Sequence, residues 1–320
     1  MTHSLPLESL RSAFGERMQE NVALGRFTAA RVGGPADVLV VVEKADQLAD
    51  AALRLWEMDL GFTVLGGGSN VLVSDSGVRG VIILNHAREV RFDEDVDPPV
   101  VWAESGANLG LVARRAAEKG LSGLEWAAGI PGTVGGAVVG NAGAHGGDIA
   151  GNIILAEILH LIKGERDLSQ PICTNRESWT AHELEYSYRT SRLKRNPGTV
   201  VLSASLQLQD STPDLVQAKI GAFKEQRRKT QPPGASMGSM FKNPPGEYAG
   251  RLIEAAGLKG TRVGDAEINR LHANFFINLG SARADDVYRL LKLAQDTVAE
   301  KFHINLELEI ELIGDWNLTG

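Results

Sequence analysis

The fold of this chain is decided by a glycine-rich stretch, Gly129-Ile130-Pro131-Gly132-Thr133-Val134-Gly135-Gly136-Ala137. A second such stretch, Gly66-Gly67-Gly68-Ser69-Asn70, directly follows residues 62–65, an apolar run that predicts a β-strand. One cluster alone would favour ordinary turns as much as a site, because glycine is the default residue where a turn needs positive φ. Two long clusters favour phosphate binding, since successive main-chain N–H groups can form a concave nest for an anion.

Neither cluster matches a standard nucleotide-binding motif. Val71 stands where the third glycine of G-x-G-x-x-G is required, and no G-x-x-x-x-G-K-[ST] occurs in the sequence. The sequence therefore excludes a P-loop enzyme, and a dinucleotide held by these loops would not be bound in the Rossmann manner.

Composition narrows the function further. The 320 residues are 43% hydrophobic and 23% charged, which is typical of a soluble enzyme of two or three domains, and 36 of them are glycine, well above the roughly 7% that is usual. A net charge of −7 argues against nucleic acid as the main partner. The single cysteine, Cys173, excludes an internal disulfide and suits a reducing compartment. No His/Asp/Glu cluster has metal-ligand spacing, and no apolar run reaches the roughly 18 residues of a membrane helix.

Strand and helix patterns alternate in the first ninety residues, and helices dominate after residue 210. Asp46 is expected to cap a helix over residues 46–55, and a further helix is predicted over residues 108–119, with Gly120 ending it. A helix with Val216, Ile220, Phe223 and Arg227 on one face is predicted before Pro232. Residues 306–312 alternate apolar side chains with glutamates, which predicts a strand. We expect an α/β chain, or α+β by strict layer.

The two glycine stretches belong to an ordered set of motifs. The others are TAARVGGPA (28–36), NAGA (141–144), YRTS (188–191), GSMFKNP (238–244) and LELE (306–309). Together they closely resemble the UDP-N-acetylenolpyruvoylglucosamine reductase family, over residues 28–313. The resemblance implies a three-domain FAD-binding fold of the vanillyl-alcohol-oxidase/PCMH type. Residues 1–85 with 305–320, and residues 86–210, would be the FAD-binding subdomains, and residues 211–304 a separate substrate-binding domain.

The resemblance also implies an activity: reduction of UDP-N-acetylglucosamine enolpyruvate to UDP-N-acetylmuramate in peptidoglycan precursor synthesis, with FAD and NADPH. It implies a cytoplasmic monomer, without membrane insertion. Relatives that bond FAD covalently carry a histidine where this chain has Pro35, so the flavin should be non-covalent. The implied cofactor-binding residues are Arg31, Gly66, Gly67, Gly68, Ser69, Asn70, Gly129, Ile130, Pro131, Gly132, Thr133, Gly135, Gly136, Asn141, Ala142 and Gly143.

Three residues would then carry the chemistry. The resemblance makes Ser239 the proton donor and Arg189 the group that faces the substrate carboxylate. Period 2 places Glu307, Glu309 and Glu311 on one strand face, and spacing alone cannot choose among them. The resemblance selects Glu309, although Leu308 stands where the family usually has proline. The implied substrate-binding residues are Tyr188, Arg227, Lys242, Asn243, His272 and Asn274.

Other interpretations remain open at this stage. Ser239 and Ser191 each begin an S-x-x-K pattern of penicillin-binding serine hydrolases, but the chain lacks S-D-N and K-T-G. A loop serine, a salt-bridged Arg189, a solvated basic run and a structural His272 are the plain alternatives. Another FAD oxidase or dehydrogenase, or a non-catalytic nucleotide-sugar-binding module, would also fit. No tyrosine lies between Arg189 and Ser239, which is typical of the shorter family type without the tyrosine loop.

Overall fold

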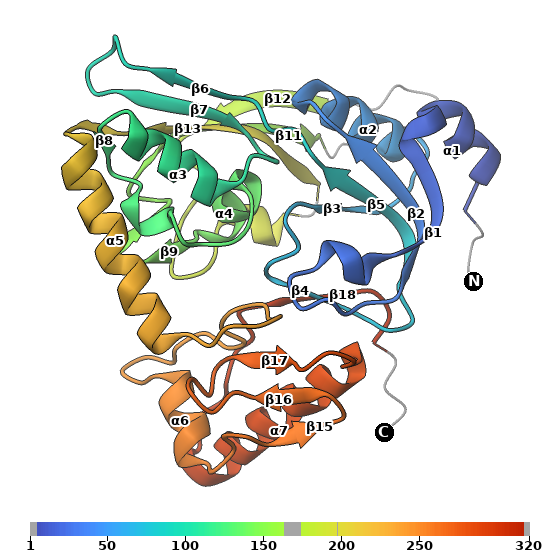
Figure 1. The fold of residues 1–320 in the computed structure, drawn as a ribbon. Helices are drawn as coiled ribbons and strands as arrows, with labels where there is room; N and C mark the ends of the chain where they lie inside the picture. The colour runs from blue at the N-terminus through green and yellow to red at the C-terminus, as the bar shows by residue number, and fades with distance from the viewer. Residues whose placement is uncertain (1–4, 163–173, 197, 317–320) are drawn as a thin grey trace. The chain divides into compact units, whose positions relative to one another are not determined.

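A computed structural model describes residues 5–162, 174–196 and 198–316, so Cys173 lies outside the described residues. The chain forms two compact units (Figure 1). The first contains the residues up to Glu20, Val38–Gly67 and Gly80–Lys224, and the second contains Asn21–Asp37, Gly68–Arg79 and the residues from Glu225 onward. The three-domain division expected from the sequence stays a prediction.

The helices are α1 (Leu7–Phe14), α2 (Ala45–Glu57), α3 (Leu109–Glu118), α4 (Val134–Gly140), α5 (Pro213–Thr230), α6 (Ala249–Ala255) and α7 (Ala284–Phe302). The strands are β1 (Met18–Ala23), β2 (Pro35–Val42), β3 (Phe62–Leu65), β4 (Val71–Val73), β5 (Val78–Asn85), β6 (Val90–Asp93), β7 (Val100–Glu104), β8 (Leu121–Ser122), β9 (Gly143–Ala144), β10 (Gly147–Asp148), β11 (Ile153–Leu161), β12 (Thr174–Trp179), β13 (Thr199–Gln207), β14 (Gln209–Asp210), β15 (Arg262–Val263), β16 (Ala266–Ile268), β17 (Phe276–Asn278) and β18 (Glu311–Ile313).

Two sheets organise the first unit. One has the order β1-β2-β5-β3, and β3 runs parallel to β5. The continuous apolar run of β5, Val81–Leu84, is buried along its whole length, as a strand covered on both faces requires. The other sheet, β12-β11-β13-β7-β6, is antiparallel throughout, so each of its strands can present different residues to its two faces.

Strand β13 serves two hydrophobic cores and contains a β-bulge. Its register against β11 shifts at Leu202, which is left as an extra residue. Val200 and Leu202 pack into the core around α2, whereas Ala204 and Leu206, beyond the bulge, pack into the core around α3 and α4. A one-residue shift moves the even-numbered residues beyond the bulge to the other face of the sheet, so Ala204 and Leu206 join Val201 in the second core.

The start of α2 differs from the sequence expectation. The N-cap position is Lys44, without a side-chain cap, and Asp46 lies inside the first turn. The main-chain N–H of Ala45 is bonded instead by the carboxylate of Glu104, at 2.7 Å, and the same carboxylate accepts from Glu89 N at 2.8 Å. Asp46 pairs with Arg176 at 2.8 Å. The expected cap was wrong because a carboxylate from β7 supplies the bond that a local side chain usually supplies.

Two other helices agree with the sequence. Asn108 caps α3 by accepting a hydrogen bond from Leu111 N at 2.8 Å, and Gly120 follows the helix with φ of +76°. In α5, Val216 is buried, and Ile220, Phe223 and Arg227 are half-buried, while most other positions are exposed. Arg227 therefore lies on the packed face of α5, as its spacing predicted.

The second unit is built on the sheet β15-β16-β17 with α6 and α7. Its core includes Phe241 and Phe276, whose rings meet edge to face at 6.2 Å. The strand predicted over residues 306–312 is shorter than expected: β18 begins at Glu311 and pairs in parallel with β4, while Leu308 forms only an isolated bridge with Phe241. The alternation holds in part: Leu306 and Ile310 are buried and Glu307 and Glu311 are exposed, but Leu308 and Glu309 are both half-buried.

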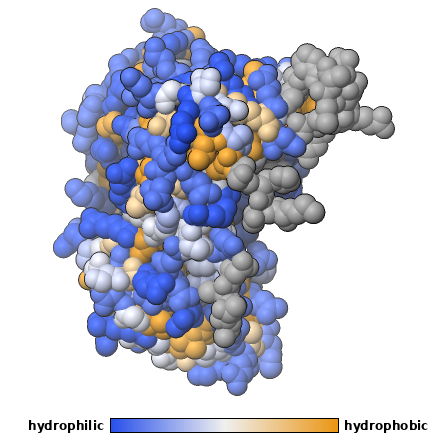
Figure 2. Space-filling model, turned by 90° about the vertical axis from the view of Figure 1, so that its right-hand side faces the viewer, coloured by the Kyte–Doolittle hydropathy of each residue, from blue (hydrophilic) through white to orange (hydrophobic). Residues whose placement is uncertain are grey.

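Hydrophilic residues cover most of the face shown in Figure 2, with apolar residues in small groups between them. Scattered exposed apolar side chains are normal on a folded protein. Among the described residues, no helix is both long and apolar enough to cross a bilayer.

The N-terminus of α7 generates a stability prediction. The Asp75 carboxylate accepts hydrogen bonds from Ala284 N at 3.0 Å and from Asp285 N at 2.9 Å, so it caps a helix that lies far along the chain. We expect Asp75→Ala to lower the free energy of unfolding by about 1–2 kcal/mol. Asp296→Ala, at an exposed position of the same helix, should cost less than about 0.5 kcal/mol. Urea unfolding checks both, and equal values would exclude the capping role.

Candidate active site

The glycine stretches of the first unit lie main chain against main chain. A Cβ on Gly66 would overlap the hydroxyl of Thr133, and a Cβ on Gly67 would lie 3.1 Å from the Cα of Gly132. Gly67, Gly129, Pro131 and Gly136 are all exposed. The surface of these loops is therefore largely bare backbone, which is the lining that a phosphate group requires.

Helix α4, which the sequence did not reveal, lies inside the longer glycine stretch. Thr133 is its N-cap, and Gly135 N donates to Ser105 O at 2.7 Å. A Cβ on Gly135 would lie 2.8 Å from the Cβ of Ser105, so this glycine is needed for packing. Gly136, one residue on, is exposed, and the nearest atom to a Cβ there would be the Thr133 hydroxyl at 3.6 Å. Gly136 is thus free to face a ligand.

Asn141 ties the glycine stretch to the turn that carries Arg189. It follows α4 in the left-handed conformation with φ of +45°, and it is buried. Its amide nitrogen donates to Ser187 O at 3.2 Å, and its amide oxygen accepts from Ala150 N at 3.0 Å. The side chain therefore holds two loops together, a role that its position in the NAGA motif alone did not reveal.

Arg189 sits in a tight turn closed by reciprocal main-chain hydrogen bonds between Ser187 and Thr190. Its φ is +57°, which is uncommon for a residue with a side chain and is found where surrounding structure enforces it. Nη2 donates to Gly143 O at 2.8 Å, and the guanidinium lies 5.7 Å from the ring centroid of Tyr188. Arg189 and strand β9 are thus direct neighbours in the first unit, and Tyr188, next to Arg189 in the chain, is exposed.

In the second unit, residues 238–242, which we call the Ser239 segment, lie between residues 274–275 and residues 307–309. Ser239 bridges to Phe275, and Phe241 bridges to Leu308. Glu309 N donates to Met240 O at 2.8 Å, and Lys242 N donates to Glu307 O at 2.9 Å. Ser239 and Glu309 are therefore brought together by main-chain bonds to Met240, although 70 residues separate them in the sequence.

Asn70, the last residue of the shorter glycine stretch, is hydrogen-bonded to the main chain of residues 309 and 311. Its amide nitrogen donates to Glu309 O at 3.0 Å, and Glu311 N donates to Asn70 O at 2.9 Å. A predicted cofactor residue is thus bonded to the carbonyl of a predicted catalytic glutamate and to the N–H group two residues further on.

Arg31 belongs to a loop that is fixed on several sides. Thr28 Oγ1 donates to Val32 O at 2.8 Å, and Ala29 N donates to Gly68 O at 2.9 Å. Asn278 Nδ2 donates to Ala30 O at 2.9 Å. Arg31 itself is exposed with φ of +57°. The contact of Asn278 with this loop was not predicted from the sequence. The only indication there is that Asn278 lies two residues before Gly280, and both residue types are common in turns.

The predicted substrate-binding residues of the second unit have varied surroundings. Lys242 Nζ lies 3.3 Å from the Glu307 carboxylate, and Asn243 Oδ1 accepts from Ala249 N, the first residue of α6, at 3.1 Å. Burial lowers the pKa of His272, whose Nδ1 accepts from Asn274 N at 3.2 Å. Asn274 is buried, and its amide bonds the main chain of Phe241.

Arg227 differs from the basic residues next to it. Burial lowers the pKa of its guanidinium, and within the described part of the chain this guanidinium makes no hydrogen bond or ion pair. Arg228 and Lys229, by contrast, are exposed and both pair with Glu225. A half-buried cation without a carboxylate partner is costly, and an anionic ligand would remove that cost.

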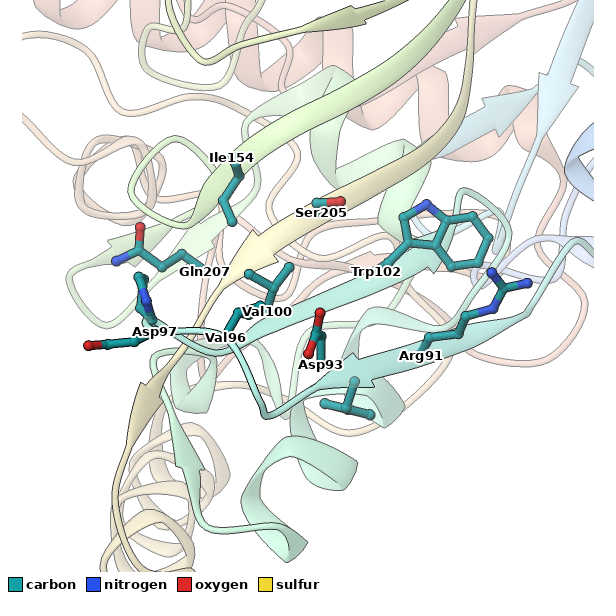
Figure 3. Close-up of a pocket in the computed structure, with 11 residues that line it drawn as sticks. Arg91, Asp93, Val96, Asp97, Val100, Trp102, Ile154, Ser205 and Gln207 are labelled. Carbon is teal, nitrogen blue, oxygen red and sulfur yellow. The ribbon is translucent and has the colours of Figure 1, made fainter.

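A cavity of about 880 Å³ lies over β6, β7, β11 and β13 (Figure 3). Its lining includes Trp102 from β7 and Arg91 from β6, whose guanidinium lies 4.8 Å from the Trp102 ring centroid. None of the cofactor-binding, substrate-binding or catalytic residues predicted from the sequence lines this cavity.

Comparison with known proteins accounts for both units. Residues 36–158 match the family model of an FAD binding domain, and residues 229–313 match that of the UDP-N-acetylenolpyruvoylglucosamine reductase C-terminal domain. The reductase of Chloroflexus aggregans is 44% identical over 303 residues, which cover 92% of this chain and 97% of that protein. That of Bacillus subtilis is 37% identical over 314 residues, covering 96% and 98%.

A solved structure agrees with these matches. The UDP-N-acetylenolpyruvylglucosamine reductase of Thermus caldophilus is 37% identical, with a TM-score of 0.75, over 92% of this chain and 99% of its own. These matches confirm the FAD-binding fold that the family resemblance implied. With such identity over almost its whole length, the chain belongs to the UDP-N-acetylenolpyruvoylglucosamine reductase family.

Proposed function

We propose that this chain reduces UDP-N-acetylglucosamine enolpyruvate to UDP-N-acetylmuramate, with non-covalently bound FAD and with NADPH as the reductant. The observation that carries the proposal is the hydrogen bonding of Met240 to Glu309, which joins the segments of the two predicted proton-handling residues. The family relationship supplies the substrate. A lone cysteine suits the reducing cytoplasm, where the reaction would provide a peptidoglycan precursor for growth and division.

The residues present fit FAD. Bare backbone at Gly67, Gly129 and Gly136 would accommodate its diphosphate, and Arg31 and Asn70 extend from loops that the surrounding hydrogen bonds fix. When bound, FAD supplies hydride transfer, the part of the chemistry that protein side chains cannot perform. Pro35, the first residue of β2, offers no nucleophile for a covalent bond to the flavin.

The side chains would then control charge and protons. Hydride addition to the vinyl carbon of the substrate leaves negative charge on the adjacent carbon and its carboxylate. Arg189 would bind that carboxylate, because its planar guanidinium forms paired hydrogen bonds and remains charged. Ser239 would donate the proton to carbon, and Glu309 would assist by hydrogen bonding.

Anaerobic spectroscopy tests this function. NADPH should bleach the flavin absorption band, and UDP-N-acetylglucosamine enolpyruvate should restore it with formation of a product heavier by two hydrogen atoms. A protein without a flavin band would be a nucleotide-sugar-binding module. A flavin that NADPH or another donor reduces, but that the enolpyruvyl sugar does not reoxidise, would identify another flavoenzyme of this fold.

The first prediction here concerns flavin retention. Gly136→Ala should weaken FAD binding by on the order of tenfold, or about 1.4 kcal/mol, because a methyl group would occupy the position proposed for the phosphates. Gly140→Ala is the matched control, since Gly140 lies in the same helix with no atom within 4 Å of a Cβ. Alanine favours a helix over glycine, so neither change should lower stability. Flavin content after desalting measures the effect, and equal retention would exclude Gly136 from the FAD site.

A second prediction distinguishes the three glutamates. Glu309→Gln should slow flavin reoxidation by the enolpyruvyl sugar by roughly 10²–10⁴-fold, the range usual for acid–base groups, while flavin reduction by NADPH is preserved. Glu311→Gln, on the exposed start of β18, should leave both steps near normal. Stopped-flow absorbance resolves the two steps. A severe loss in Glu307→Gln with a normal Glu309→Gln would place the acid two residues earlier.

A third prediction concerns Arg227. If it binds the diphosphate of the substrate, Arg227→Ala should raise KM for the enolpyruvyl sugar by about ten- to a hundredfold, the loss of a charge-assisted hydrogen bond or two. The rate of flavin reduction by NADPH should be unchanged. Arg228→Ala, which removes only an exposed ion pair with Glu225, should change KM by less than about twofold. Steady-state kinetics check this, and similar KM values for the two variants would refute it.

A further inference from the structure

The conformation at Ser239 depends on the residues that follow it. Ser239 comes after Gly238, whose φ is +78° and whose Cβ position would be open, so the preceding side offers little restraint. Met240 and Phe241, which follow, are fully buried. The position of Ser239 therefore depends on its bridge to Phe275 and on how the main chain of Met240 and Phe241 is held.

Asn274 provides three of the hydrogen bonds that hold this main chain. Its carbonyl oxygen accepts from Met240 N at 2.9 Å. Its side-chain Oδ1 accepts from Phe241 N at 3.0 Å, and Nδ2 donates to Phe241 O at 2.8 Å. A single amide side chain thus satisfies both main-chain groups of Phe241, as a neighbouring strand would.

The opposite side of the segment is bonded to Glu309. Met240 donates its N–H to the carbonyl oxygen of Asn274, and its own carbonyl accepts from Glu309 N. Met240 thus links Asn274 to Glu309. Asn274 is 3% exposed, and its own N–H donates to His272 Nδ1 at 3.2 Å. The oxygen and the nitrogen of the Asn274 amide are both hydrogen-bonded to the main chain of Phe241. The side chain therefore makes its main hydrogen bonds to the protein itself.

We propose that Asn274 is a positioning residue that holds Ser239 in register with Glu309 by clamping the main chain of Phe241. This inference rests on the proposed function and assigns Asn274 a different role from the substrate contact that the resemblance implied. Aspartate has nearly the same shape but no N–H donor, so it would place a carboxylate oxygen against Phe241 O. Alanine would leave two buried main-chain groups unpaired.

The test compares Asn274→Asp and Asn274→Ala with the wild-type protein. At saturating enolpyruvyl sugar, flavin reoxidation should slow by about ten- to a hundredfold, since misplacement by about 1 Å can cost that much. Substrate Kd and the rate of flavin reduction by NADPH should stay within about twofold. In a Ser239→Ala background, Asn274→Ala should cause no further loss, because the group that it positions is already missing.

Asn152→Ala is the control for a general loss of stability. Asn152 also makes two side-chain hydrogen bonds, to Trp126 Nε1 at 3.0 Å and to Gln207 O at 3.1 Å, but in the first unit and outside the predicted site. It should lower the melting temperature and leave both half-reactions near normal. The two substitutions at residue 274 keep the test open if one of them fails to fold.

Three results would overturn the inference. A lower melting temperature with normal reoxidation would make Asn274 purely structural, and a raised Kd with a normal rate would make it a substrate contact. Independent losses in the Ser239→Ala double variant would show that it does not act through Ser239. A wild-type flavin that the enolpyruvyl sugar cannot reoxidise would overturn the proposed function as well, which distinguishes that failure from the other three.

Discussion

Main-chain segments in this protein approach each other so closely that a side chain cannot stand between them. A Cβ on Gly67 would lie 3.1 Å from the Cα of Gly132, and a Cβ on Gly135 would lie 3.0 Å from the carbonyl oxygen of Ser105. The abundance of glycine is therefore a packing requirement as well as a matter of turns. The same close approach leaves exposed positions such as Gly136 bare, and bare main chain is what the phosphates of a cofactor need. Fold and cofactor site thus depend on one constraint.

In the second unit, main-chain hydrogen bonds do comparable work at the proposed chemical centre. The residues around Ser239 form no strand of a named sheet, yet Met240 and Phe241 are bonded on both sides. This arrangement gives strand-like main-chain bonding to the irregular segment that carries the proposed proton donor. A buried amide such as Asn274 is costly unless fully bonded, and here both of its side-chain atoms are bonded.

Much of this could be predicted from the sequence, and the failures have physical reasons. The helix that ends before Gly120 and the packed face of α5 were predicted correctly because both depend on residues within a few turns. The cap of α2 was not, because Glu104 reaches it from 59 residues away. Helix α4 was hidden by its glycines, which have poor helix propensity and are tolerated here by packing. The shortened β18 reflects competition, since the residues before it bond the Ser239 segment instead of a sheet. The pairing of Asn274 with Phe241 leaves no pattern in the sequence.

The carboxylate of Glu104 also constrains the order in which the first unit can form. During synthesis, all of α2 is made before residue 104 is added, so until then its first turn has no Glu104 side chain to satisfy Ala45 N. A helix end without a cap frays, and an isolated helix of this length is marginal in water. The helix can therefore be completed only once β7 is present to provide Glu104, which also binds Glu89 N at the start of the β6–β7 hairpin. One buried carboxylate thereby couples the start of α2 to the β6–β7 hairpin, two parts of this unit that are distant in the sequence.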